Sequence, residues 1–204
     1  MLVMLPLSLV FLGPLGNIIG AGLANSILWL QNIFGPLATA IVGALFPLLI
    51  VTGMHHALNS AAMVEYVKKG YDSCIWAGSY IMDFKFLALC FASLIKSKKK
   101  ENKTLAMSCI ATEGIGGISE PTIFGIMLKS RKNILYVMAG GFFGGFYIGL
   151  MNVNVYVFAP SGFLSVFAYS GGSTANFVNG IIACIIAFVV PFTLALLFGL
   201  GIED

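Results

Sequence analysis

Two carboxylates stand within an apolar part of the chain, in the stretch EGIGGISEPTIFGI from Glu113 to Ile126, with one proline and four glycines. A carboxylate at membrane depth is costly and marks a functional site by default. Ionised Glu120 would offer two oxygens as acceptors, which suits hydroxyl donors such as those of a sugar. The glycines and Pro121 would let the backbone approach that ligand closely. We therefore predict a ligand site at Glu120, with the alternative that its charge caps a half-helix.

Besides Glu120, three charged residues lie in apolar surroundings: Glu113, Asp83 and Lys85. Glu113 precedes Glu120 by seven residues, about two helical turns, so it could share the same cavity. It could equally pair with Lys85 or lie near a loop. Asp83 and Lys85 are two residues apart and would not pair with each other on a helix. They either line the pocket or pair with other segments.

A second group of polar residues is TGMHHALN, Thr52 to Asn59. Adjacent residues on a helix point in different directions, so at most one of His55 and His56 is expected to face a cavity. A metal site would need more ligands nearby, and the four scattered cysteines contain no CxxC pair. We expect neither metal nor cofactor, and we interpret the histidines as hydrogen-bonding partners of a polar solute.

The composition sets the class of protein. The chain is 59% hydrophobic and 9% charged, whereas a soluble domain has roughly 25% charged residues. This predicts an integral membrane protein and makes a nucleic-acid-binding role improbable. Eight of the 11 basic residues fall in two short runs, KSKKKENK at Lys96–Lys103 and KSRK at Lys129–Lys132. Such loops favour the cytoplasmic side of the membrane.

The hydrophobic segments predict an all-α bundle with several spans, since about 20 apolar residues cross a bilayer. A long broken helix from Met1 through residues 13–30 is expected first, and Ala57–Asp72 reads as an interfacial or re-entrant piece. The predicted spans are Phe34–Met54, Cys74–Ile95, Ile134–Phe158 and Phe177–Gly201. The chain opens inside a hydrophobic run without a basic leader, from which we expect a fragment or a shortened chain.

Leu105–Leu128 lies between the two basic runs. If both runs are cytoplasmic, this segment enters the membrane and returns on the same side. We expect two short half-helices, broken near Gly116, Gly117 and Pro121. Freed backbone groups at membrane depth are tolerated only inside protein or beside water. A broken segment of this kind points to the binding site of a transporter.

At GGISEPTIFG the chain resembles the membrane component EIIC of the bacterial sugar phosphotransferase system, in its glucose/β-glucoside/sucrose superfamily. The TGMHH step, the KSKKK loop and the LGPLG stretch resemble that family too. The resemblance implies an all-α membrane fold with re-entrant hairpins. It further implies that residues 1–31 end a scaffold half that forms dimers, and that 32–204 form the sugar-transport half.

The resemblance also implies a function. The family binds a sugar near Glu120 and His55 and moves it toward the cytoplasm, where an EIIB partner supplied by EIIA phosphorylates it. No phosphate-carrying residue is expected in this chain, and the sugar is expected to be a β-glucoside or related disaccharide. The candidate substrate-binding residues are Glu120, His55, His56, Gly117, Ser119, Pro121, Thr122, Glu113 and Asp83.

Two alternatives remain open on the sequence. The chain could be an uncoupled or proton-coupled carrier that uses its carboxylates and histidines as a relay. It could also be a non-transporting fragment that acts only in assembly with other chains. The segment SYIMDFKFLAL departs from relatives through Asp83 and Lys85, which leaves the identity of the sugar open.

Overall fold

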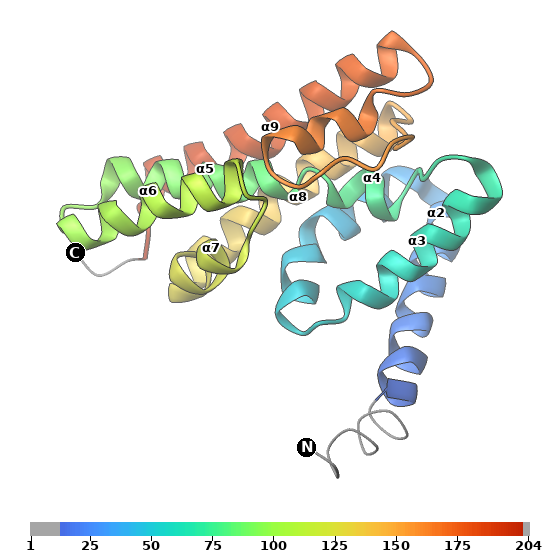
Figure 1. The fold of residues 1–204 in the computed structure, drawn as a ribbon, viewed down its shortest axis with the longest axis horizontal. Coiled ribbons are helices and arrows are strands. Elements are labelled where there is room, and N and C mark those ends of the chain that lie inside the picture. Colours follow the sequence, from blue (N-terminus) through green and yellow to red (C-terminus); the bar gives the residue numbers. More distant parts are fainter. Residues whose placement is uncertain (1–12, 202–204) are drawn as a thin grey trace.

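The computed structural model describes residues 13–201, which form a bundle of helices (Figure 1). Within this range the β pairing consists of one isolated bridge between Asp72 and Val155. The elements are α2 (Gly13–Val51), α3 (His55–Lys69), α4 (Ile75–Ser79), α5 (Met82–Lys96), α6 (Lys100–Gly114), α7 (Glu120–Gly125), η2 (Met127–Lys129), α8 (Arg131–Leu150), η3 (Phe163–Tyr169) and α9 (Thr174–Phe198). The helix expected over residues 1–12 lies outside the described residues.

Four stretches are long and apolar enough to cross a membrane: Ala21–Val51, Ile75–Lys96, Arg131–Leu150 and Thr174–Phe198. They confirm the prediction of an all-α membrane protein. The predicted span Ile134–Phe158 was too long, because α8 ends at Leu150. Beyond that end the φ of Asn152 is 50°, a left-handed conformation that stops a helix.

Helix α2 is kinked at Phe34, whose φ and ψ are −150° and 84°. Pro36 explains the kink, since its ring collides with the carbonyl of the residue four positions earlier and it lacks an N–H. The predicted span Phe34–Met54 begins at this same residue. The start of α2 extends away from the other helices (Figure 1). Nearer the kink the same helix packs on the bundle, where Ile27 belongs to the core and Gln31 donates to the Ser73 hydroxyl at 2.7 Å.

Helix α8 is the centre of the packing, and one of its faces is made of glycine. Gly141, Gly145 and Gly149 recur every fourth residue and therefore share one side of the helix. A methyl group on any of them would overlap backbone atoms of α2. Small residues of this kind let membrane helices approach each other closely.

A second glycine face of α8 meets α9. A Cβ atom on Gly140 would lie 2.6 Å from Cδ of Pro191 and 2.8 Å from the carbonyl oxygen of Ala187. Pro191 lacks an N–H to bond that carbonyl, four residues earlier in α9. Helix α8 thus packs against α2 and α9 on neighbouring faces.

Lys85 joins α5 to α2 and is completely buried. Its Nζ donates a hydrogen bond to the carbonyl oxygen of Gly43. That oxygen has no helical donor, because the residue four positions later is Pro47. The open question about Lys85 is thereby answered: it bonds to the backbone of another helix, and Gly141 leaves the space for its side chain.

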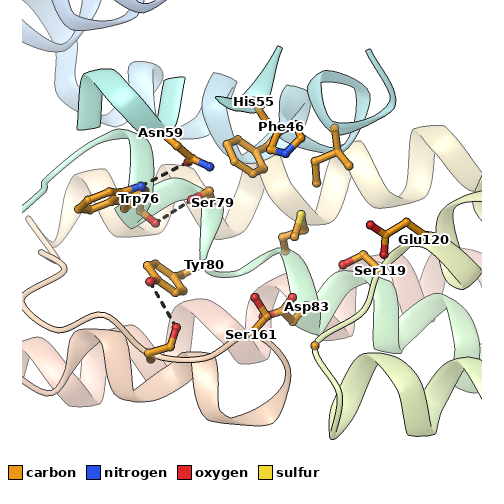
Figure 2. Close-up of a pocket in the computed structure, with 14 residues that line it drawn as sticks. Phe46, His55, Asn59, Trp76, Ser79, Tyr80, Asp83, Ser119, Glu120 and Ser161 are labelled. Carbon is orange, nitrogen blue, oxygen red and sulfur yellow. Dashed lines mark hydrogen bonds between the residues drawn. The ribbon is translucent and has the colours of Figure 1, made fainter. Parts of the chain in front are cut away.

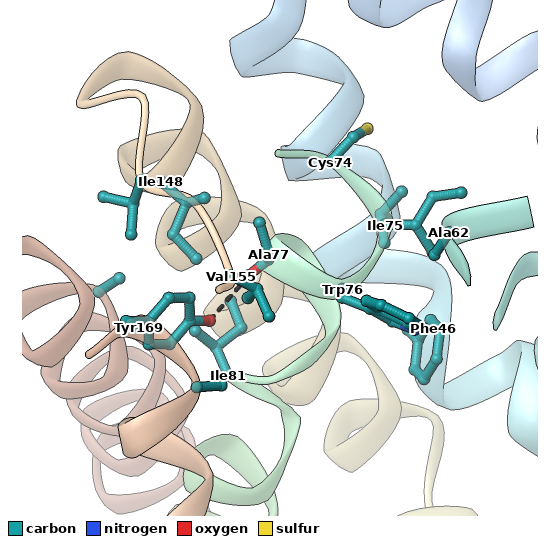
Figure 3. Packing of buried hydrophobic residues seen from close by; sticks show 14 of the residues in the cluster. Phe46, Ala62, Cys74, Ile75, Trp76, Ala77, Ile81, Ile148, Val155 and Tyr169 are labelled. Carbon is teal, nitrogen blue, oxygen red and sulfur yellow. Dashed lines mark hydrogen bonds between the residues drawn. The ribbon is translucent and has the colours of Figure 1, made fainter. Parts of the chain in front are cut away.

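Asp72 fixes the start of α4. Its Oδ1 accepts the backbone N–H groups of Cys74, Trp76 and Ala77 at 3.1, 2.7 and 3.1 Å. Burial raises the pKa of this carboxyl group, while the three N–H donors act in the opposite direction. The core then closes over α4, where the Tyr169 hydroxyl donates to the carbonyl of Ala77 at 2.8 Å (Figure 3).

Adding one methyl group to the α2–α8 contact should destabilise the protein. We expect Gly145→Ala to lower the free energy of unfolding by about 1–3 kcal/mol, because the new Cβ overlaps the backbone at Thr39. Gly22→Ala is the matched control in α2, with no atom within 4 Å of its new Cβ. Thermal unfolding of the purified protein in detergent measures both. Equal melting temperatures for the two variants would contradict this packing.

Removing the Asp72 carboxyl group should loosen α4. Asp72→Ala leaves three N–H groups without their acceptor and should cost about 2 kcal/mol or more. Asp72→Asn keeps an oxygen at the same position and should recover most of that loss. The same unfolding measurement compares them, and an Asn variant as unstable as the Ala variant would show that these hydrogen bonds contribute little.

Candidate functional site

A cavity of about 300 Å³ lies where α3, α4 and the start of α5 face the turn between α6 and α7 (Figure 2). Its polar lining residues come from four separate parts of the chain. They are His55, Asn59, Ser79, Tyr80, Asp83, Ser119, Glu120 and Ser161, accompanied by Phe46, Ile50, Trp76, Met82, Gly117 and Ala159. Carboxylates, hydroxyls, an amide and aromatic rings thus surround one volume.

The turn between α6 and α7 brings the Glu120 motif to the cavity. Gly117 ends the first helix with φ 63°, and its N–H bonds the carbonyl of Glu113 at 3.2 Å, as in a left-handed C-cap. A Cβ on Gly117 would lie 2.6 Å from Cβ of Ser161, so glycine is required here for space as well. The predicted break at Gly116 and Gly117 is confirmed.

Pro121 has a different place from the one predicted. It lies in the first turn of α7 instead of at the break. Proline suits this position, because the first N–H groups of a helix have no intrahelical acceptor. Whether the two half-helices form a re-entrant hairpin remains a prediction.

Glu120 is the first residue of α7, and its side chain reaches the cavity (Figure 2). Its carboxylate makes no hydrogen bond or salt bridge to another described residue. Its negative charge lies at a helix N-terminus, where the helix dipole favours it. Both sequence interpretations therefore fit together: the position stabilises the charge and leaves both oxygens available to a ligand.

The rings of His55 and His56 pack against each other, with their centroids 4.0 Å apart. His55 lines the cavity, whereas His56 does not. Nδ1 of His55 lies 3.4 Å from the carbonyl oxygen of Leu49, and a bond donated there leaves Nε2 for a ligand. Burial and the neighbouring His56 lower the pKa of His55, which favours the neutral ring.

Trp76, Tyr80 and Asn59 form an aromatic and amide wall of the cavity, which faces the carboxylates of Asp83 and Glu120. Nε1 of Trp76 donates to Oδ1 of Asn59 at 3.3 Å, and the Tyr80 hydroxyl donates to the carbonyl of Ala159 at 3.4 Å (Figure 2). Sequence reasoning missed this wall. One signal was available, since Asn59 follows His55 by four residues and so shares its helix face.

Five of the nine candidate residues line the cavity: Glu120, His55, Gly117, Ser119 and Asp83. The other four, His56, Pro121, Thr122 and Glu113, lie outside its wall. Thr122 is buried against α5, with its Oγ1 3.4 Å from Sγ of Cys90. Glu113 is buried as well and accepts a hydrogen bond from the Ser119 hydroxyl at 3.2 Å. It contacts the site through that residue and forms no ion pair with Lys85.

Known proteins are similar to this chain along most of its length. The arbutin-, cellobiose-, and salicin-specific EIIBC component of Escherichia coli (strain K12) is 27% identical over 204 residues, covering 100% of this chain and 42% of the relative. The beta-glucoside-specific EIIBCA component of Bacillus subtilis (strain 168) is 30% identical over 197 residues, covering 94% and 30%. The sucrose-specific EIIBC component of the same organism is 27% identical over 186 residues, covering 90% and 40%.

The chain thus spans less than half the length of these relatives. No solved structure matches it. Residues 1–141 match the family described as Phosphotransferase system, EIIC. That range includes the His55 step, the basic loop and the complete Glu120 turn. The chain therefore belongs to the EIIC family of the phosphotransferase system, the sugar-specific membrane permeases.

Proposed function

We propose that this chain binds a sugar in the cavity at Glu120 and carries it across the cytoplasmic membrane for phosphorylation. The observation that supports this most is the free carboxylate of Glu120, which faces His55 and Asn59 across one cavity. Sugar hydroxyls can donate to carboxylate oxygens, and hydrogen bonds to a charged group are the stronger kind. The ring of Trp76 offers an apolar surface beside these groups for the carbon face of a sugar.

The proposed substrate is a β-glucoside or a related disaccharide. The names of three relatives include arbutin, cellobiose, salicin, β-glucoside and sucrose. A cavity of about 300 Å³ is at the lower end of ordinary ligand sites and suits a small sugar. His55, Ser119, Asp83 and Gly117 are the proposed contacts around Glu120.

The proposed partners follow from the same family. A phosphorylated cysteine of an EIIB domain, charged by EIIA, would transfer its phosphoryl group to a sugar hydroxyl. The S–P bond breaks, an O–P bond forms, and the hydroxyl proton leaves. The cysteines of this chain suit no such role, because all four are buried. The basic runs at Lys96–Lys103 and Lys129–Lys132 would face the cytoplasm, where that partner acts.

We also propose the division of the chain into the end of a scaffold half, residues 1–31, and a transport half, residues 32–204. The kink at Phe34 lies close to this boundary. The start of α2 extends away from the bundle (Figure 1), which fits a helix that begins in a neighbouring unit. A homodimer formed through the scaffold half, surrounded by lipid, is the proposed assembly.

Replacing the Glu120 carboxylate should abolish coupled sugar phosphorylation. We expect Glu120→Gln to lower the rate by about 100-fold, because a charged acceptor contributes about 1.5–3 kcal/mol. The assay uses membranes containing this chain, phosphoenolpyruvate, the general phosphotransfer proteins, EIIA and EIIB, with a panel of labelled β-glucosides and disaccharides. Glu65→Gln is the control: Glu65 pairs with Lys69 at 2.8 Å on α3, away from the cavity. Wild-type membranes that contain the chain and phosphorylate no sugar would count against the proposal.

The two histidines provide a matched pair for the binding step. His55→Ala should weaken sugar binding by about tenfold, the loss of roughly one hydrogen bond. His56→Ala should leave the affinity within about twofold, because that side chain does not line the cavity. Equilibrium binding of labelled cellobiose and salicin to each purified variant measures this. An equal loss in both would mean that the histidines act through the fold of α3.

A further inference from the structure

Two buried carboxyl groups meet beside the cavity, one from α5 and one from α6. Asp83 is 2% exposed and Glu113 is 0% exposed. One glycine lies against both residues: the N–H of Gly162 bonds to Asp83, and a Cβ on Gly162 would lie 2.8 Å from the carbonyl oxygen of Glu113. At this short range the two carboxyl groups act on each other electrostatically. One oxygen of each, Oδ1 of Asp83 and Oε2 of Glu113, has no hydrogen-bond donor in the described part of the chain. A pair of carboxylates cannot satisfy itself, since ionised carboxylates only accept hydrogen bonds.

The remaining two oxygens are already used. Oδ2 of Asp83 accepts the backbone N–H of Gly162 at 2.8 Å. Oε1 of Glu113 accepts the Ser119 hydroxyl at 3.2 Å. Two hydroxyls also lie near the pair, Ser165 by Asp83 and Thr122 by Glu113. The Ser165 hydroxyl donates to the carbonyl of Tyr80 at 3.3 Å, and the Thr122 hydroxyl lies 3.4 Å from Sγ of Cys90. Each carboxyl group therefore keeps one oxygen without a hydrogen-bond donor. One proton between the pair would supply that donor and convert the contact into a short O–H···O bond.

The charges around the pair favour the same conclusion. The titratable groups that interact with the two carboxyls are Lys85, Tyr80, Cys90, Tyr169 and Cys184, with Glu120 and His55 lining the same cavity. Lys85 is the cation among them and donates to Gly43, not to a carboxylate. With Lys85 charged, a pair that holds one proton balances this buried cation, and the charge of Glu120 lies at the exposed side of the cavity. Two ionised carboxylates would leave an uncompensated buried charge, which is strongly unfavourable. Burial and the Asp83 charge raise the pKa of Glu113, in the same sense.

The pair holds together the wall of the cavity. Asp83 lines the cavity and bonds to Gly162, next to the lining residue Ser161. Glu113 bonds to Ser119, next to Glu120. Contact between the two carboxyls thus links the 159–163 segment to the turn that carries Glu120. In Figure 2 Asp83 lies beside Ser161, and Ser119 lies beside Glu120.

We propose that Asp83 and Glu113 bind one proton between them, and that the cavity binds sugar with this proton in place. The second half of this inference rests on the proposed sugar function. When the proton leaves, two negative charges repel across the link, and the segments carrying Ser161 and Glu120 separate. Sugar affinity then falls with rising pH. By thermodynamic reciprocity, sugar binding in alkaline solution takes up a proton.

The direction in which pH changes the sugar affinity follows from the raised pKa of Glu113. A carboxyl group whose pKa is raised in the folded state favours the protonated form, so the linked state is present at low pH and is lost as pH rises through the raised value. For a single linked proton the affinity of the wild type falls by at most about tenfold per pH unit above that value. A site that needed both carboxylates ionised would show the opposite slope.

Glu113→Gln imitates the protonated pair. Its amide nitrogen can donate to Oδ1 of Asp83, while its oxygen still accepts from Ser119. We expect this variant to bind labelled cellobiose and salicin within a few-fold of the wild type at neutral pH and to lose the alkaline fall. Asp83→Asn, which donates in the opposite direction, should lose the fall as well. Glu65→Gln removes a carboxylate outside the cavity and should keep it.

Infrared spectroscopy gives a readout that needs no sugar. The wild-type chain should show the carbonyl band of a protonated carboxyl group at neutral pH, and this band should disappear at alkaline pH. Subtracting the spectrum of Glu113→Gln isolates the band of the pair from that of buried Asp72. Melting temperatures of the variants in detergent identify any that fail to fold, and either Glu113→Gln or Asp83→Asn suffices for the comparison.

The two readouts separate the possible outcomes. A band that titrates, together with a pH-dependent affinity that both amide variants abolish, supports the inference. Absence of the band in wild type at neutral pH, or an unchanged alkaline fall in the folded amide variants, overturns it. A titrating band in a chain that neither binds nor phosphorylates any sugar supports the shared proton. The same result overturns the coupling of that proton to sugar binding, and it overturns the proposed function.

Discussion

The close contact of α8 with two other helices is the constraint on which the rest of the structure depends. In lipid the hydrophobic effect does not press helices together, so tight packing of their surfaces must do so. The glycines of α8 supply that packing on two faces at once, against α2 through Gly145 and against α9 through Gly140. Helix α5 packs against the same helices. Its charged residues Asp83 and Lys85 are therefore enclosed and must find partners within the protein.

Interrupted helices then form the candidate functional site within this bundle. Away from water, each break frees backbone groups that must be bonded internally. The break after α6 is closed by Gly117, and the start of α4 is closed by Asp72. Both breaks place side chains at the cavity, Glu120 in one case and Trp76 in the other. The same backbone geometry that would be a defect in a straight span becomes the means of positioning polar groups.

Sequence reasoning located most helices because their signals are local. Apolar length predicted the spans, and the Gly116–Gly117 pair marked the turn before Glu120. The kink at Phe34, which Pro36 explains, was not predicted, although a predicted span starts at that residue. The end of α8 was missed because the apolar residues after it continue the hydropathy signal, while Asn152 turns the backbone.

The site was predicted less completely than the fold. Trp76 and Tyr80 are aromatic residues in an apolar segment, and nothing local distinguishes a cavity wall from a core. Their role depends on packing between segments far apart in the chain. Similarly, sequence alone left Lys85 and Glu113 as possible partners, since it does not show that Pro47 frees a carbonyl for the lysine.

Glu113 and Glu120 show how far environment decides the chemistry of one residue type. They lie seven positions apart, on either side of one turn, yet one is fully buried and the other opens into the cavity. Glu120 has the N-terminus of α7 to stabilise its charge and keeps its oxygens free for a ligand. Glu113 has a second carboxyl group as its neighbour, and burial disfavours its charge. Ser119 bonds to Glu113 and directly precedes Glu120, so one side chain connects the buried carboxyl group to the turn that carries the exposed one. Within that turn, seven positions therefore separate a carboxyl group whose charge is disfavoured from one whose charge is favoured.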